Sequence, residues 1–193
     1  MSIIVNGNVI IERDLTDRIP NSLLQFLDGT LIVNARLFKK IYDGYGFSIS
    51  HRFENVASGD SVEIYFENPA NSGRVVFIIS IEITTFAQAW ADVYRNNSVT
   101  SSGTTTTPVN LNFGSNIASV VSVEYGGTYS LGDNVHNTVV PGGSRIRAIG
   151  SQSEVGEVVI IPEGKNFIVR VTNKSGSSSD ISVRIIWWEE VAS

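Results

Sequence analysis

Residues 161–190, IPEGKNFIVRVTNKSGSSSDISVRIIWWEE, contain two stretches in which apolar and polar side chains alternate. The apolar face of each stretch is formed by every second residue: Phe167, Val169 and Val171 in the first, and Ile181, Val183, Ile185 and Trp187 in the second. A period of two is that of a β-strand with one buried side. The loop between them, residues 173–179, is rich in residues that tolerate turn geometry. The pattern therefore predicts an antiparallel hairpin with one buried face.

The composition indicates a globular chain with few charges. Its 193 residues suffice for one large domain, or for a domain with an extra arm. Hydrophobic residues make up 42% of the chain and charged residues only 17%. A charge-poor surface is expected of a protein that covers itself with partner subunits, although a monomeric β-sandwich can have the same composition.

The net charge, the absence of cysteine and the first residues exclude several classes of protein. With a net charge of −5, the chain has no overall field that would attract nucleic acid. The absence of cysteine excludes disulfides, thiolate chemistry and cysteine-based metal sites. Residues 1–14, MSIIVNGNVIIERD, have no basic region and no long apolar run, so we expect neither a signal peptide nor a membrane span there.

Residues 44–193 are expected to form an all-β domain, an antiparallel β-sandwich or jelly roll. The expected strands, besides the final pair, are Phe47–Phe53, Ser61–Glu67, Arg74–Thr85, Ala89–Tyr94, Ser119–Tyr125, Thr138–Val140 and Glu157–Ile161. Short strands separated by turns rich in Gly, Ser, Thr and Asn are typical of such folds. The low-complexity tract 98–108, SVTSSGTTTTP, is predicted to be a surface loop.

Residues 1–43 differ from the rest and are expected to form an N-terminal arm. Asn6-Gly7 between two short apolar runs predicts a hairpin, and Asn21 and Gly29 are suitable caps for a two-turn helix. The arm carries apolar runs that a closed sandwich does not need, and these would be unfavourable in water. It can pack on its own domain, on another subunit or on the capsid, and we predict that it packs on another subunit.

A search for catalytic chemistry finds no convincing constellation, so we predict no enzyme, no metal site and no cofactor. His51 and His136 have no acid or histidine at a ligand-like spacing, and His51 is expected on the outer face of a strand. The nucleophile elbow, the zinc-protease motif and the phosphate loop are absent. Glycoside hydrolysis needs two carboxylates that face each other across a cleft. The candidates are Glu63, Glu82, Glu124 and Glu157, but each lies on an alternating strand, where we expect it to point outward into solvent.

Aromatic and arginine side chains are the better candidates for a binding surface. The interface candidates are Trp90, Trp188, Tyr94, Tyr125, Tyr129, Arg145 and Arg147. Trp187 is expected in the core, whereas Trp90 and Trp188 fall on the opposite faces of their strands, as interface anchors do. The alternatives are that the rings fill the core or line a carbohydrate groove, and that Arg145 and Arg147 are solvated loop charges.

Several blocks of sequence, in a fixed order, carry a resemblance to a known family. They are Phe47–Phe53, Tyr94, Val99-Thr100 with Gly103-Thr104, Asn110 and Asn112, Pro162–Phe167, Arg170–Gly176 and Trp187-Trp188-Glu189. Together they resemble the head decoration or capsid-surface proteins of tailed phages and viruses, over about residues 45–190. Arg95 departs from the pattern, because the family tends to carry an acid there, and residues 1–43 have no counterpart.

The resemblance implies a non-enzymatic structural role on the virion. The expected protein is made in the host cytoplasm, forms a homo-oligomer, with a trimer favoured, and docks on the major capsid protein or another virion protein. Nucleic acid and membranes are not expected partners. The alternative is a carbohydrate- or receptor-binding β-sandwich, such as a fibre tip or lectin-like module. A row of exposed rings along a groove would favour sugar, and a flat apolar patch with an arginine rim would favour protein.

Overall fold

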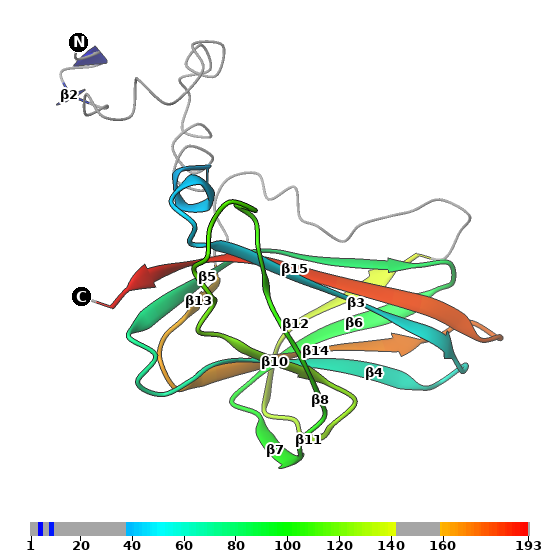
Figure 1. The fold of residues 1–193 in the computed structure, drawn as a ribbon. Coiled ribbons are helices and arrows are strands. Elements are labelled where there is room, and N and C mark those ends of the chain that lie inside the picture. Colours follow the sequence, from blue (N-terminus) through cyan, green and yellow to red (C-terminus); the bar gives the residue numbers. More distant parts are fainter. Residues whose placement is uncertain (1–3, 6–7, 10–37, 142–158, 193) are drawn as a thin grey trace. The chain divides into compact units, whose positions relative to one another are not determined.

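The computed structural model describes residues 4–5, 8–9, 38–141 and 159–192 (Figure 1). Residues 1–39 and residues 40–193 form separate compact units, a division close to the boundary expected after residue 43. In the first unit, β1 (Ile4–Val5) and β2 (Asn8–Val9) pair antiparallel, on either side of the expected Asn-Gly turn. The helix expected at residues 22–28, between Asn21 and Gly29, lies outside the described residues, and so do Arg145 and Arg147.

The second unit is an antiparallel β-sandwich with the strand order of a jelly roll. Its framework in the described residues is β3 (Gly46–Val56), β4 (Ser61–Asn68), β5 (Arg74–Thr85), β6 (Ala89–Arg95), β12 (Asp133–Val140), β13 (Val159–Ile161), β14 (Lys165–Asn173) and β15 (Ser179–Val191). One sheet contains the order β13-β5-β15-β3 and the other contains β12-β6-β14-β4. The predicted all-β sandwich is therefore confirmed.

The prediction that the last two strands form a hairpin is wrong. β14 pairs with β4 and β6, whereas β15 pairs with β3 and β5, so the two strands lie in different layers (Figure 1). Their apolar faces look toward each other across the core. A period of two shows that each strand has one buried side. Two neighbouring strands of one sheet and two strands of facing sheets have the same pattern, so the pattern does not distinguish these arrangements.

Five short strands of the described chain lie between β6 and β12: β7 (Ser98–Ser101), β8 (Thr104–Thr106), β9 (Val109–Asn110), β10 (Ser122–Tyr125) and β11 (Thr128–Ser130). β10 and β8 extend one sheet to six strands, and β9 extends the other to five. β7 and β11 form a separate two-stranded ribbon at the bottom of Figure 1. The prediction of a surface loop at 98–108 is thus wrong, because β7 pairs with β11 and β8 pairs with β10. The β-branched threonines of this tract favour strands.

The core lies between the two sheets and is rich in aromatic rings. Phe66 of β4 lies edge-on to Trp187 of β15, with ring centroids 5.1 Å apart, and stacks on Phe167 of β14 at 4.7 Å. All three rings are at most 3% exposed. Burial of this kind contributes roughly 25 cal/mol for each Å² of apolar surface, which is what holds the two sheets together.

Buried asparagines close the two ends of the sandwich. Asn173, at the end of β14, donates from its amide to the carbonyls of Val56 and Ser177, both at 2.8 Å. Asn68, at the end of β4, donates to the carbonyls of Arg74 and Ile161 at 2.8 and 3.0 Å. Both asparagines are at most 1% exposed. Their amides satisfy carbonyls where the chain crosses between sheets and ladder hydrogen bonds end.

Candidate functional site

The outer face of the six-stranded sheet gathers aromatic and charged side chains. Side chains alternate along a strand, so those that do not enter the core project from this face. On it, Ile168 of β14 lies between Tyr65 of β4 and Tyr94 of β6. In the next row, Arg170 lies between Glu63 and Asp92.

Two tyrosines form the centre of this face. Tyr129, from the ribbon strand β11, stacks on Tyr65 with ring centroids 5.5 Å apart and an interplanar angle of 7°. Tyr65 is only 5% exposed, and Tyr129 is half-buried. Burial and then the negative charge of Glu67 raise the pKa of Tyr65 to about 12. Burial and then the charge of Glu124 raise the pKa of Tyr129 to about 12. Both phenols therefore keep their protons at neutral pH and can donate hydrogen bonds.

Glu124 of β10 is a buried carboxylate beside these rings. Its Oε2 accepts a hydrogen bond from the Gly103 N–H at 3.2 Å. Its Oε1 is buried and has no hydrogen-bond partner among the described residues. The expectation that Glu124 is a solvated outward carboxylate is wrong, because the side chain points out of the sandwich but lies beneath neighbouring segments. A hydrogen-bond interaction between this carboxylate and the Tyr129 hydroxyl contributes to the raised pKa of Tyr129.

Glu63 and Arg170 add an ion pair to the same face. Arg170 Nε lies 3.4 Å from Glu63 Oε1. Burial raises the pKa of the Glu63 carboxyl, and the positive charge of Arg170 opposes this effect. The other two acids considered as catalytic candidates do not join them: Glu82 pairs with Arg184 on the five-stranded sheet at 3.3 Å, and Glu157 lies outside the described residues.

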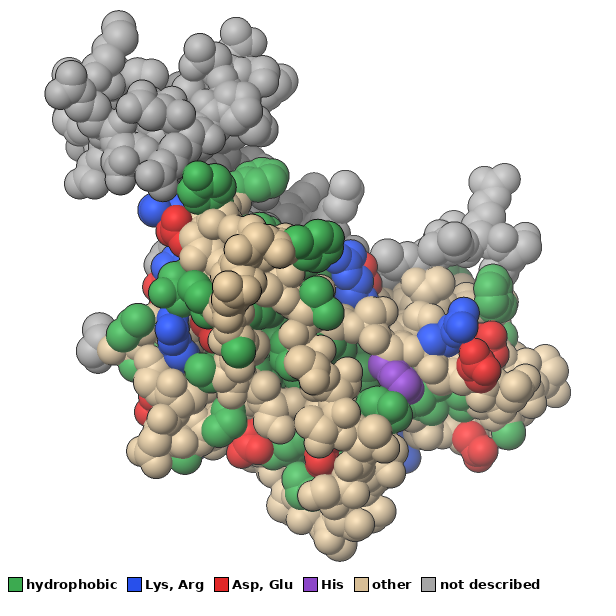
Figure 2. All heavy atoms as spheres, in the orientation of Figure 1, with side chains coloured by type: hydrophobic (Ala, Val, Ile, Leu, Met, Phe, Trp, Pro, Cys, Tyr) green, Lys and Arg blue, Asp and Glu red, His purple; other side chains and the backbone are tan. Residues whose placement is uncertain are grey.

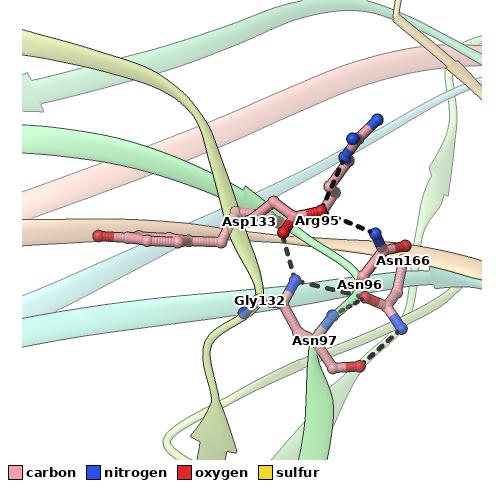
Figure 3. Close-up of polar contacts among 7 residues, drawn as sticks. Arg95, Asn96, Asn97, Gly132, Asp133 and Asn166 are labelled. Atoms are coloured by element: carbon pink, nitrogen blue, oxygen red, sulfur yellow. Dashed lines mark hydrogen bonds and ion pairs between the residues drawn. The ribbon is translucent and has the colours of Figure 1, made fainter.

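A network of polar contacts fixes the base of the ribbon to the sheet (Figure 3). Asn97, between β6 and β7, is 7% exposed and accepts the Gly132 N–H on its Oδ1 at 3.0 Å. Arg95 and Asp133 form an ion pair at 3.3 Å across the same junction. Gly132 must be a glycine here, because a Cβ would lie 2.1 Å from the Arg95 carbonyl oxygen. The network holds both ends of the insertion, and with them Tyr129, over the outer face.

Among the predicted interface residues, Trp90, Tyr94 and Tyr129 lie on this one face. Trp90 is 49% exposed, as expected of a surface anchor, and the Lys174 ammonium lies 4.2 Å from its ring centroid. Val139 of β12 lies directly opposite Trp90 in the sheet and is 55% exposed. The two form a small exposed apolar pair at the edge of the sheet.

The prediction that Trp188 is an exposed anchor is wrong. Its side chain is 3% exposed and stacks on Phe77 of the neighbouring strand β5, with centroids 5.2 Å apart. Alternation correctly places it opposite Trp187. A side chain directed away from the sandwich core can nevertheless be covered by its neighbours. The direction of the Trp188 side chain was therefore not sufficient to predict its exposure.

Tyr125 lies apart from the other candidates, on the inner side of β10. It stacks on His51 of β3 at 3.6 Å, and Phe53 meets both rings edge-on. The expectation that His51 faces outward is wrong, because it shares the inward face of β3 with Ile49 and Phe53. Burial lowers the pKa of the His51 imidazole, which favours its neutral form.

Sequence reasoning missed Tyr65 and Arg170 as site residues. A signal was present: Glu63, Tyr65 and Glu67 share the polar side of β4, so that side carries an aromatic residue between two acids. An aromatic residue on the otherwise charged face of a strand indicates that something covers that face. Here Tyr129 does so.

No family model, no curated protein and no solved structure matches the chain. Within the described residues, no three His, Cys, Asp or Glu side chains come together in a way that could hold a metal ion. None of the helical segments in the described part of the chain has the length and apolarity that crossing a membrane requires.

Proposed function

We propose that the protein is a non-enzymatic structural subunit of a virion surface, which forms a homo-oligomer, with a trimer favoured, and docks on the capsid. The observation that carries this proposal is the strand order β13-β5-β15-β3 facing β12-β6-β14-β4. This jelly roll is an architecture used by viral capsid proteins and by lectins. A fold alone does not assign a function, and the virion role rests in addition on the resemblance over residues 45–190.

The surface agrees with a subunit that is covered by partners. On the face seen in Figure 2, charged side chains are scattered, and neutral polar and apolar groups occupy most of the area. Trp90 and Val139 add an exposed apolar pair at a sheet edge. Exposed aromatic residues of this kind are typical anchors of subunit contacts.

Light scattering coupled to size-exclusion chromatography tests the oligomer. A chain of 21.0 kDa is expected to run as a trimer of about three times that mass. Trp90→Ser should lower this mass at a given concentration, and Phe86→Ser, which removes another exposed ring, 69% exposed, should not. A strict monomer at high concentration would contradict the proposal. Labelling of intact particles with an antibody against the protein tests the virion location.

Carbohydrate binding is the second candidate, and the outer face of the six-stranded sheet favours it. Sugar sites combine aromatic rings with carboxylates that accept hydroxyl protons. Tyr129 is a partly exposed ring on this face, and Tyr65 and Glu124 lie buried directly beside it. A glycan array followed by calorimetry tests it: Tyr129→Ala and Glu124→Gln should abolish sugar binding while the oligomeric mass stays unchanged. Absence of binding to any glycan on the array would reject this candidate.

A further inference from the structure

The free edges of the two sheets are unequal. In the described residues, the six-stranded sheet ends in β8 and β12, and the five-stranded sheet ends in β9 and β13. β8 and β9 have only three and two residues, and the described part of β13, which starts at the first residue after the gap, has three, whereas β12 has eight. A short edge strand offers few unpaired backbone groups, and a long one is a template on which another strand can pair. Among the described strands, β12 is thus the long free edge.

β12 lacks the usual protection over most of its length. Natural edge strands are commonly shielded by lysine, proline, inward charges or bulges. A bulge lies between Asn134 and His136, and Asp133 supplies one charge, but both are at the first end of the strand. Residues 136–140, HNTVV, contain no Lys, Arg, Asp, Glu or Pro, and they pair regularly with β6 on their other side. This half of the edge is suited to pairing.

The exposed apolar pair lies on the same half. Val139 is 55% exposed and its cross-strand neighbour Trp90 is 49% exposed. A strand added beside β12 would cover Val139 and extend the surface next to Trp90. The edge therefore combines unpaired backbone groups with apolar side chains, the two components of β-strand addition.

We infer that β12 pairs antiparallel with β12 of a second copy of this chain, about a two-fold axis at Thr138. In this register Thr138 lies opposite itself, Asn137 lies opposite Val139 of the second copy, and His136 lies opposite Val140 of the second copy. The segment carries no Asp, Glu, Lys or Arg that would meet its own copy across the axis, and Thr–Thr is a favourable cross-strand pair. The five-residue segment can therefore pair with itself without charge repulsion, as a two-fold contact requires.

The contact joins the two six-stranded sheets into one continuous sheet. The axis is perpendicular to the sheet, so both copies present the same outer face, and the two Trp90–Val139 pairs lie on either side of the axis on that face. Because the contact has two-fold symmetry, it links two trimers, or forms a dimer where no trimer exists. It does not depend on the virion assignment.

Engineered cysteines test this register directly, because the chain contains none of its own. Directly opposed residues in an antiparallel pair have Cα atoms about 4.5 to 5.5 Å apart, within the range that a disulfide spans. Under mild oxidation, Thr138→Cys should form a covalent dimer. Asn137→Cys and Val139→Cys should cross-link poorly alone but efficiently when mixed, because each lies opposite the other. Absence of the mixed cross-link, or equal cross-linking of each variant alone, would overturn the register.

A charge on the edge tests the contact itself. Val139→Lys should weaken self-association by roughly tenfold or more, since it removes apolar surface at the contact and places a lysine from each copy on the same face, on either side of the two-fold axis, where the two charges repel. Val109→Lys is the matched control, because Val109 is 53% exposed on the two-residue edge strand β9. Sedimentation equilibrium measures both. Unchanged association of Val139→Lys would overturn the inference. If the protein forms trimers but Thr138→Cys gives no covalent dimer, this contact is rejected and the proposed trimer stands. If Thr138→Cys gives covalent dimers but no trimer forms, the contact stands and the proposed trimer is rejected.

Discussion

Asn97 and Asn166 are 69 residues apart and join their segments by three hydrogen bonds (Figure 3). The Asn97 N–H and its side-chain amide both donate to Asn166 Oδ1, at 2.9 and 3.3 Å, and the Asn166 amide donates to the Asn97 carbonyl at 3.1 Å. Asn97 lies where the insertion leaves β6, and Asn166 lies in β14 of the jelly-roll framework. The pair therefore ties the ribbon that carries Tyr129 to the sheet that carries Tyr65.

Removing the Asn166 amide should loosen this junction. Asn166→Ala leaves the buried N–H and carbonyl of Asn97 without their partners, and we expect a loss of about 1 to 3 kcal/mol in the free energy of unfolding. Urea denaturation followed by circular dichroism measures it. Thr128→Ala, an exposed position in the same ribbon, is the control and should change stability by less than about 0.5 kcal/mol. Equal effects of the two changes would contradict the assignment.

Glu189 should make stability depend on pH. This carboxylate is 1% exposed and accepts hydrogen bonds from Ser119, Val120 and Trp187 on its Oε1. Burial raises its pKa above the ordinary value of 4.5, and these hydrogen bonds only partly oppose the shift. Between 4.5 and the raised pKa the folded protein binds more protons than the unfolded chain, so its contribution to stability falls as pH rises through that window.

Glu189→Gln tests this sign. Glutamine resembles the protonated acid and keeps an oxygen for the same donors, so the variant should match the native chain near pH 4. As the pH rises to neutral, the free energy of unfolding of the variant should increase relative to that of the native chain. Thermal denaturation across this pH range measures it. A difference that shifts toward the native chain instead would show that the carboxylate is stabilised in its charged form.

The two tryptophans Trp188 and Trp90 should respond differently to truncation. Trp188→Ala removes a buried ring from its stack on Phe77 and should cost about 3 to 5 kcal/mol in the free energy of unfolding. Trp90→Ala removes a half-exposed ring and should cost less than about 1 kcal/mol while weakening self-association. Chemical denaturation and light scattering separate the two effects. A large loss of stability with Trp90→Ala would place that ring in the core instead.

Gly132 should not tolerate a side chain. In Gly132→Ala the new methyl group would lie 2.1 Å from the Arg95 carbonyl oxygen and 2.6 Å from that of Asn96, so the junction must move. We expect a loss of about 1 to 3 kcal/mol in the free energy of unfolding. Gly176→Ala is the matched control, because nothing lies within 4 Å of its added carbon. A melting temperature of Gly132→Ala equal to that of the control would contradict the close contact.

Alternation along the chain was sufficient to predict most framework strands. The strand at Arg74–Thr85 has the predicted bounds, and those at Gly46–Val56 and Ser61–Asn68 extend the predicted ones by a few residues. A strand buries every second side chain whatever its partners are, so this signal is local. The threonine tract at 98–108 gave no such signal, because its strands become regular only when β10 and β11 pair with them.

The candidate site was only partly predictable for the same reason. Exposure of Trp90 followed from its place on a strand, but burial of Trp188 depends on Phe77, which lies more than a hundred residues earlier in the chain. The stack of Tyr129 on Tyr65 likewise joins the inserted ribbon to the framework. No short-range pattern reports contacts of this kind.

By itself, the sequence determined which residues form strands and which side of each strand is apolar, because local backbone geometry sets that alternation. Only the tertiary structure decided that β14 and β15 face each other from different sheets, that Glu124 lies buried beside Tyr129, and that β12 is an edge strand among the described residues. These features depend on which distant segments pack together, and that is settled by the summed burial and hydrogen bonding of the whole fold.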